Sequence, residues 1–118
     1  MDPKTNVLVV DDNLDLAENI AEILGLRGFI ATIATSGEEA LPKTIPDGPS
    51  LVVTDYRLPG MTGAELVRQI RAQRRGVRAI VISAYTDDRT IAAAHEAGAD
   101  FLPKPVDVHE LSRILTDA

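Results

Sequence analysis

Short apolar runs alternate with longer amphipathic segments along nearly the whole chain, and this alternation restricts the fold more than any other feature. The apolar runs occupy residues 7–10, 29–34, 51–54, 79–82 and 100–102. The first, third and fourth runs consist mostly of Val, Ile and Leu, which is typical of strands buried on both faces of a parallel sheet. The second run is mixed, as expected of an edge strand. Strands that alternate with helices predict an α/β domain with helices on both faces of its sheet.

The segments between the runs carry helical periodicity and helix-capping residues. Leu14, Ala17, Ala21 and Leu24 form the apolar stripe of a first helix, which Gly28 is expected to end. Further signals predict the limits of later helices: Ser36 with Glu39, Thr62 with Glu65, Asp107, and Gly98 at the end of a helix that begins near Thr86.

The second helix is expected to be short. Pro42 lies within residues 37–43, and a proline removes a backbone donor and clashes with the preceding turn. Pro46, Gly48 and Pro49 follow, so we expect an irregular stretch over about residues 43–50. The element order is then βαβαβαβαβα. Right-handed crossovers favour a doubly wound five-stranded parallel sheet of the flavodoxin-like (βα)5 type, with strand order 2-1-3-4-5.

Composition and charge exclude several classes of site and partner. The 118 residues, taken as one domain over 1–118, contain no Cys, which excludes disulfides and thiolate metal sites. The net charge is −6 at pH 7, and we expect no direct contact with nucleic acid. No apolar run is long enough to span a membrane, and residues 1–6 lack the apolar core of a signal peptide. We therefore expect a cytoplasmic domain without membrane contact.

Polar residues with complementary chemistry follow four of the five predicted strands. Asp11 and Asp12 follow the first strand, Asp55 the third, Ser83 the fourth and Lys104 the fifth. The carboxyl ends of parallel strands meet at one edge of a sheet, which is where ligands bind in such folds. Three neighbouring carboxylates repel one another, and Mg²⁺ relieves this because it prefers carboxylate oxygens and water. The lysine and the hydroxyl provide a cation and a donor suited to a phosphoryl group.

Each of these residues also has an ordinary structural interpretation. Asp12 or Asn13 would cap the first helix, Asp55 would sit in a turn, Ser83 would be a structural hydroxyl, and Lys104 would be a solvated charge. Taken singly, these interpretations are at least as good as a functional one. Taken together, four strand ends that direct matching chemistry to one place favour a phosphoryl-binding site.

The same residues resemble those of the receiver domain of bacterial response regulators. The resemblance extends from Val7 to about Leu115 and rests on specific motifs. These are the acidic pair Asp11-Asp12, the run from Val53 to Gly63 around Asp55, the pair Ser83-Ala84, and Lys104-Pro105 after Phe101-Leu102-Pro103.

The resemblance implies a role for each residue of the site. Asp55 would be the nucleophile that accepts a phosphoryl group from a phosphohistidine. Mg²⁺ would be held by Asp12, Asp55 and the backbone carbonyl of Arg57, with Asp11 acting through a water. Lys104 and Ser83 would each contact a phosphoryl oxygen, and Lys104-Pro105 would be a cis peptide. Arg57 and Tyr85 would influence the lifetime of the phosphate.

The resemblance also implies a phosphorylation-activated switch rather than a turnover enzyme. Ser83 would move toward the phosphate, and Phe101 would turn inward and change the face of the fourth helix, fifth strand and fifth helix. That face would control an output domain or partner, and it permits a homodimer. The phosphodonor would be a sensor histidine kinase or phosphotransfer protein, which would dock on the first helix near Asn13, Asp15 and Glu18.

Three other interpretations stay open at this point. A phosphatase-like hydrolase would carry Asp-x-Asp after its first strand, whereas Asp11 and Asp12 are adjacent. A flavodoxin-like cofactor binder would need a phosphate-cradling loop there, where the two carboxylates would repel a phosphate. A receiver that serves only for docking would not need a complete site. The sequence does not identify the kinase, the stimulus, or any output domain in the natural protein.

Overall fold

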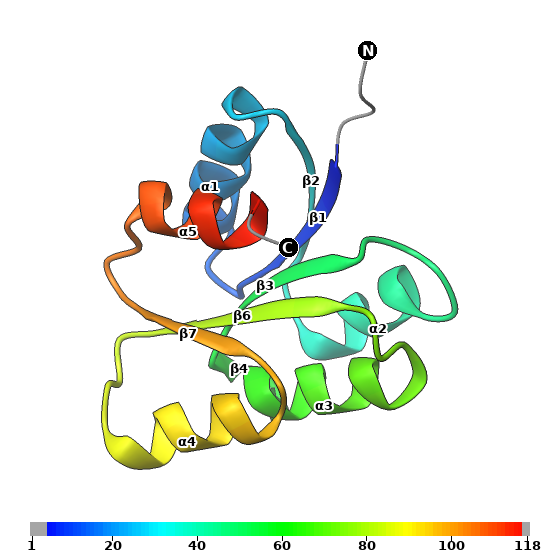
Figure 1. Cartoon of the computed structure of the whole chain (residues 1–118), viewed down its shortest axis with the longest axis vertical. Coiled ribbons are helices and arrows are strands. Elements are labelled where there is room, and N and C mark those ends of the chain that lie inside the picture. The colour runs from blue at the N-terminus through cyan, green and yellow to red at the C-terminus, as the bar shows by residue number, and fades with distance from the viewer. Residues whose placement is uncertain (1–4, 117–118) are drawn as a thin grey trace.

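Five parallel strands form the central sheet of the computed structural model, which describes residues 5–116 (Figure 1). The strands are β1 (Thr5–Val10), β2 (Phe29–Ala34), β3 (Leu51–Asp55), β6 (Arg78–Ser83) and β7 (Asp100–Pro103). Their order across the sheet is β2-β1-β3-β6-β7. This confirms the predicted order 2-1-3-4-5. In this order β2 lies on one side of β1, and β3, β6 and β7 lie on the other side.

Helices cover both faces of the sheet. One face carries α1 (Leu14–Leu26) and α5 (Val108–Thr116), and the other carries α2 (Gly37–Thr44), α3 (Gly63–Gln73) and α4 (Asp88–Glu96) (Figure 1). Successive side chains of β1 alternate between two buried clusters: Val7 and Val9 pack with α1 and α5, whereas Leu8 and Val10 pack toward α3. Burial on both faces explains the continuous apolar runs. Within residues 5–116, no helix is both long and apolar enough to cross a membrane.

A small hairpin follows β3 and was not among the expected elements. Its strands are β4 (Arg57–Leu58) and β5 (Met61–Thr62), paired antiparallel. Gly60 in the turn has φ +79°, a left-handed conformation that glycine adopts without steric cost. The hairpin leads directly into α3, so it connects the end of β3 with the N-terminus of that helix.

Side chains cap the helices largely as the sequence predicts. Ser36, Thr62 and Asp107 accept hydrogen bonds from the backbone N–H groups of Glu39, Glu65 and Glu110 respectively. Asn13, rather than Asp12, caps α1. The fourth helix begins at Asp88 instead of near Thr86, because Asp87 accepts the N–H of Thr90 as its cap. Gly28 and Gly98, with φ of 95° and 93°, follow the ends of α1 and α4 as expected.

The second helix is short, as predicted, and spans Gly37–Thr44 with Pro42 inside it. The irregular stretch that follows is held by Arg74 at the end of α3. Its guanidinium donates to the carbonyl oxygens of Thr44, Gly48 and Pro49 at 3.0, 3.2 and 3.2 Å. A loop without regular structure thereby has partners for backbone groups that would otherwise be left unpaired.

Candidate phosphoryl-acceptor site

The strand register brings the predicted site residues to one level of the sheet. Val10 of β1 pairs with Thr54 of β3, so Asp11 and Asp55 follow neighbouring positions. Asp55 pairs with Ile82, which precedes Ser83, and Ser83 pairs with Pro103, which precedes Lys104. The carboxyl edge of the sheet therefore collects all of these side chains, as the sequence predicts.

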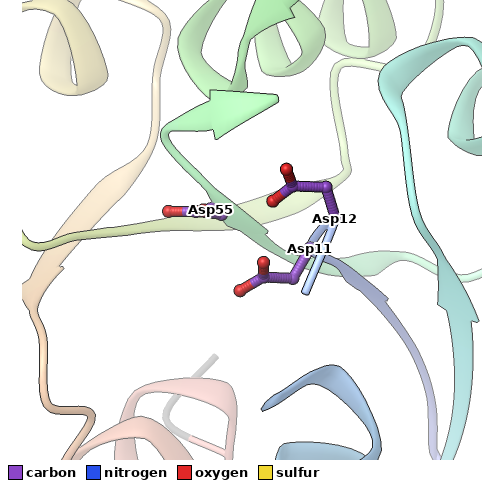
Figure 2. Close-up of side chains that lie close together, drawn as sticks. All are labelled: Asp11, Asp12 and Asp55. Carbon is purple, nitrogen blue, oxygen red and sulfur yellow. The ribbon is translucent and has the colours of Figure 1, made fainter. Parts of the chain in front are cut away.

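Three carboxylates converge at this edge (Figure 2). Asp11 and Asp12 come from the end of β1 and Asp55 from the end of β3, and one oxygen of each lies within 4.8 Å of the others. Asp11 and Asp55 are buried, whereas Asp12 is exposed. Oxygen ligands at this spacing, with one open side, suit a hard divalent cation such as Mg²⁺.

Asp11 is the most deeply buried of the three carboxylates, with 1% of its surface exposed. Its Oδ1 accepts the backbone N–H of Asn13 at 3.0 Å. Within residues 5–116, no hydrogen-bond donor reaches its buried Oδ2. Burial raises the pKa of the Asp11 carboxyl, and the negative charges of Asp55 and Asp12 raise it further, against the opposing Asn13 N–H and Lys104. A carboxylate in this condition gains from a cation at the site.

Lys104 supplies positive charge between two of the carboxylates. Its Nζ lies 3.3 Å from Oδ1 of Asp55 and 3.6 Å from Oδ2 of Asp11. Its backbone N–H donates to the carbonyl oxygen of Ser83 at 2.8 Å, which extends the pairing of β6 and β7 by one step. The Lys104-Pro105 peptide is cis, as predicted, and Ile45-Pro46 is a second cis peptide. The ammonium is therefore in place to meet an oxygen group attached to Asp55.

Ser83 ends β6 with 1% of its surface exposed, and its Oγ accepts the backbone N–H of Tyr85 at 2.9 Å. A hydroxyl that accepts one hydrogen bond can still donate its own hydrogen to another acceptor. Phe101 lies further back, in β7 opposite Val81, half-buried against the cluster beneath α3 and α4. A ring at this position contacts the face that the predicted switch would change.

The backbone behind Asp55 is closely packed. Gly63 at the start of α3 donates its N–H to the carbonyl oxygen of Tyr56 at 2.6 Å. A Cβ at Gly63 would overlap the carbonyl oxygen of Asp55, so only glycine allows this approach. The Thr54 hydroxyl donates to the same Asp55 oxygen at 2.9 Å. The main chain at Asp55 is thus held from two sides.

One contact beside the site was not foreseen. The guanidinium carbon of Arg57 lies 4.4 Å from the ring centroid of Tyr85. The family resemblance connects both residues with the phosphate but not with each other. No spacing pattern could have revealed the pair, because Arg57 begins β4 after β3 and Tyr85 lies in the loop after β6.

Comparison with known proteins identifies the family. Residues 7–116 match the sequence profile of the response regulator receiver domain. The chain belongs to this family. Receiver domains are signalling domains of two-component systems; they interact with histidine kinases or phosphotransfer proteins, and they usually bind Mg²⁺ at an acidic cluster such as the one present here.

Individual relatives agree with this assignment. A response regulator receiver protein of Anaeromyxobacter sp. is 45% identical over 102 residues, which cover 86% of this chain and 43% of that protein. The sensory transduction protein RegX3 of Mycobacterium bovis is 37% identical over 108 residues, covering 91% and 47%. The chain therefore spans less than half the length of either. A receiver protein structure from Pseudomonas putida superposes with a TM-score of 0.90 at 34% identity, covering 100% of both chains.

Proposed function

We propose that this receiver domain, residues 1–118, accepts a phosphoryl group on Asp55 from a sensor histidine kinase or phosphotransfer protein. An Oδ atom of Asp55 attacks phosphorus, the P–N bond of the phosphohistidine breaks, and the imidazole leaves with its electron pair. The observation that carries the proposal is the convergence of Asp11, Asp12 and Asp55 within 4.8 Å, with the ammonium of Lys104 3.3 Å from Asp55.

The donor set fits Mg²⁺. The buried Oδ2 of Asp11 accepts no hydrogen bond within residues 5–116, and the pKa of the carboxyl is raised although Lys104 lies 3.6 Å away, so a further cation would stabilise its ionised form. We propose that Asp12 and Asp55 bind the ion directly together with the Arg57 carbonyl, and that Asp11 acts through a water. When bound, the ion supplies positive charge that offsets the repulsion between carboxylates and phosphoryl oxygens.

Lys104 and Ser83 hold the phosphoryl group once it is on Asp55. The Lys104 ammonium, already in ion-pair range of Oδ1 of Asp55, pairs with one phosphoryl oxygen. Ser83 turns its O–H hydrogen toward another oxygen. Its movement leaves space beneath the end of β6, which the half-buried ring of Phe101 fills. The face of α4, β7 and α5 then changes and becomes the surface for an output domain, a partner or a second copy of the domain.

The phosphodonor has a docking surface beside the site. A groove of about 490 Å³ runs between α1 and the segment after β7, and Lys104 is part of its lining. The apolar lining residues are Leu16, Ile20, Ile23, Pro105, Val106 and Val108. Asp15, Glu18 and Glu22 line the adjoining surface of α1. We propose that a helix of the donor packs its apolar side into this groove and so brings its histidine to Asp55.

The test is the intact mass of wild type and Asp55→Asn after incubation with acetyl phosphate, with and without Mg²⁺. The proposal predicts one added phosphoryl group in wild type with Mg²⁺, none in Asp55→Asn, and little without the ion. A rapidly hydrolysed adduct would escape detection, so beryllofluoride binding is measured in parallel. Absence of both the adduct and beryllofluoride binding would overturn the proposal. The cytoplasmic location expected from the sequence stays a prediction.

A further inference from the structure

The stacked pair of Arg57 and Tyr85 joins the segments that follow β3 and β6, on either side of the proposed phosphoacceptor. Arg57 begins β4, two residues after Asp55, and Tyr85 lies two residues after Ser83. The guanidinium lies over the ring at 4.4 Å from its centroid. Both residues are exposed, Tyr85 by 50%. Beyond the edge of the sheet, a cation is therefore held over an aromatic ring within a few residues of the phosphorylation site.

The contact between the Arg57 guanidinium and the Tyr85 ring is weaker than the contact that a phosphoryl group would offer the same guanidinium. An exposed cation–π contact is among the weaker interactions of an arginine, worth about a two- to fivefold shift in an equilibrium. A hydrogen bond between guanidinium and a phosphoryl oxygen is charge-assisted and stronger. Guanidinium also matches phosphoryl geometry with two parallel donors. The guanidinium of Arg57 would therefore bind a phosphoryl group on Asp55 in preference to the ring of Tyr85.

The other cation at the site is already engaged. Lys104 lies in ion-pair range of both Asp11 and Asp55 in the unphosphorylated domain. A phosphoryl group brings about two negative charges and three acceptor oxygens. Lys104, Ser83 and a divalent cation would each meet one phosphoryl oxygen, and each of these oxygens can accept a further hydrogen bond. Arg57, at the start of β4, is the next cation along the chain after Asp55.

We propose that Arg57 is a second phosphoryl-binding cation, beside Lys104, and that the ring of Tyr85 binds its guanidinium until Asp55 is phosphorylated. Phosphorylation exchanges the ring of Tyr85 for a phosphoryl oxygen as the partner of the guanidinium. This inference rests on the proposed function, because it requires a phosphoryl group on Asp55. The exchange also releases Tyr85, whose backbone N–H donates to Ser83 Oγ at 2.9 Å. The loss of the stack thereby affects the segment directly after Ser83, the residue that ends β6 and carries the proposed switch hydroxyl.

The sign of the effect distinguishes this arrangement from a simple steric cover. If Tyr85 competes for Arg57, removing the ring strengthens the binding of a phosphoryl analogue. It does so only while Arg57 is present. If Tyr85 merely shields the site or packs beside the analogue, its removal weakens binding or acts equally with and without Arg57.

The experiment measures the affinity of the full chain for beryllofluoride in saturating Mg²⁺ by isothermal titration calorimetry. Tyr85→Leu is expected to bind about two- to fivefold more tightly than wild type. Arg57→Ala, which keeps the backbone carbonyl, is expected to bind more weakly. The affinity of the double variant should equal that of Arg57→Ala. Tyr85→Phe, which keeps the aromatic ring, should bind beryllofluoride with the wild-type affinity. In the NMR spectrum, the Tyr85 ring resonances should shift on beryllofluoride addition in wild type.

Two results would overturn the inference. One is an affinity of Tyr85→Leu for beryllofluoride that is unchanged or weaker than that of wild type. The other is an equal gain in affinity when Tyr85→Leu is introduced into the Arg57→Ala variant. Circular dichroism of every variant checks that it is folded. If wild type itself fails to bind beryllofluoride, both the proposed function and this inference are refuted. If wild type binds and only the variants depart from expectation, the proposed function stands and the role of Arg57 does not.

Discussion

Gly63 lies directly behind Asp55, the proposed phosphoacceptor, and replacing it with alanine should impair both stability and phosphorylation. The added Cβ would overlap the backbone carbonyl oxygen of Asp55 and lie 3.1 Å from Cγ2 of Thr54. The N–H of Gly63 donates to Tyr56 O at 2.6 Å, so α3 cannot move away without weakening that bond. The clash therefore falls on the main chain that positions the Asp55 carboxylate.

The expected magnitude follows from this geometry. To reach ordinary van der Waals contact, the methyl group or the carbonyl must shift by roughly 1 Å. Overpacking against a backbone that cannot yield costs about 1–3 kcal/mol. Alanine recovers at most about 1 kcal/mol through its helix propensity. The net loss therefore lies between about 0 and 3 kcal/mol, and we expect about 1–2 kcal/mol, the middle of this range. Such a loss lowers the Tm of a domain of this size by roughly 4–8 °C.

Two other helical glycines provide matched controls. Gly25 is an exposed residue of α1, with nothing within 4 Å of a built Cβ, and Gly25→Ala should raise stability by about 0.5–1 kcal/mol. Gly37 would meet the side chain of Met61, which can move, so Gly37→Ala should fall between the other two. Urea unfolding followed by circular dichroism gives the stabilities, and intact mass after acetyl phosphate treatment gives the phosphorylation rate. Wild-type stability and rate in Gly63→Ala would refute the reasoning.

Four further substitutions test the electrostatics and the core. Burial raises the pKa of Asp11, so its ionised form carries a penalty that is present at neutral pH and disappears below its ordinary value of 3.8. Asp11→Asn should therefore raise the Tm at pH 7 without Mg²⁺ and reduce the gain from added Mg²⁺ in differential scanning fluorimetry; a lower Tm without the ion would contradict this. The hydrogen bond from Thr90 lowers the pKa of Asp87, so that the stability it contributes is present above pH 3.8 and is lost as the pH falls through the lower folded-state value. Asp87→Ala should make the acid limb of the unfolding curve less steep, and an unaltered limb would argue against it. Leu111→Ala, at a fully buried position, should cost about 2–5 kcal/mol in urea unfolding. Leu26→Ala, at a position 83% exposed, should change stability by no more than about 0.5 kcal/mol, and similar losses in both would contradict the burial argument.

The order of the strands, and the set of polar residues that gather at one edge of the sheet, could be predicted from the sequence alone. Both depend on information that is local in the chain. Periodicity marks buried strands, and each polar residue of the site directly follows one of them. Parallel strands with right-handed crossovers then bring Asp55, Ser83 and Lys104 to one edge without any knowledge of side-chain packing. Most helix caps were predictable for the same reason, because a cap and its partner are only three residues apart.

How these groups interact could be learned only from the folded structure. The burial of Asp11, and the lack of a hydrogen-bond donor to its Oδ2 within residues 5–116, depend on what packs around the end of β1. The stack of Arg57 on Tyr85 and the contacts of Arg74 with the loop after α2 join segments far apart in the chain. Such contacts depend on loop conformations and side-chain rotamers, and no periodic pattern or residue spacing in the sequence predicts these. The chemistry at each strand end is a local property, but the environment that sets its charge state and its partners is a property of the assembled domain.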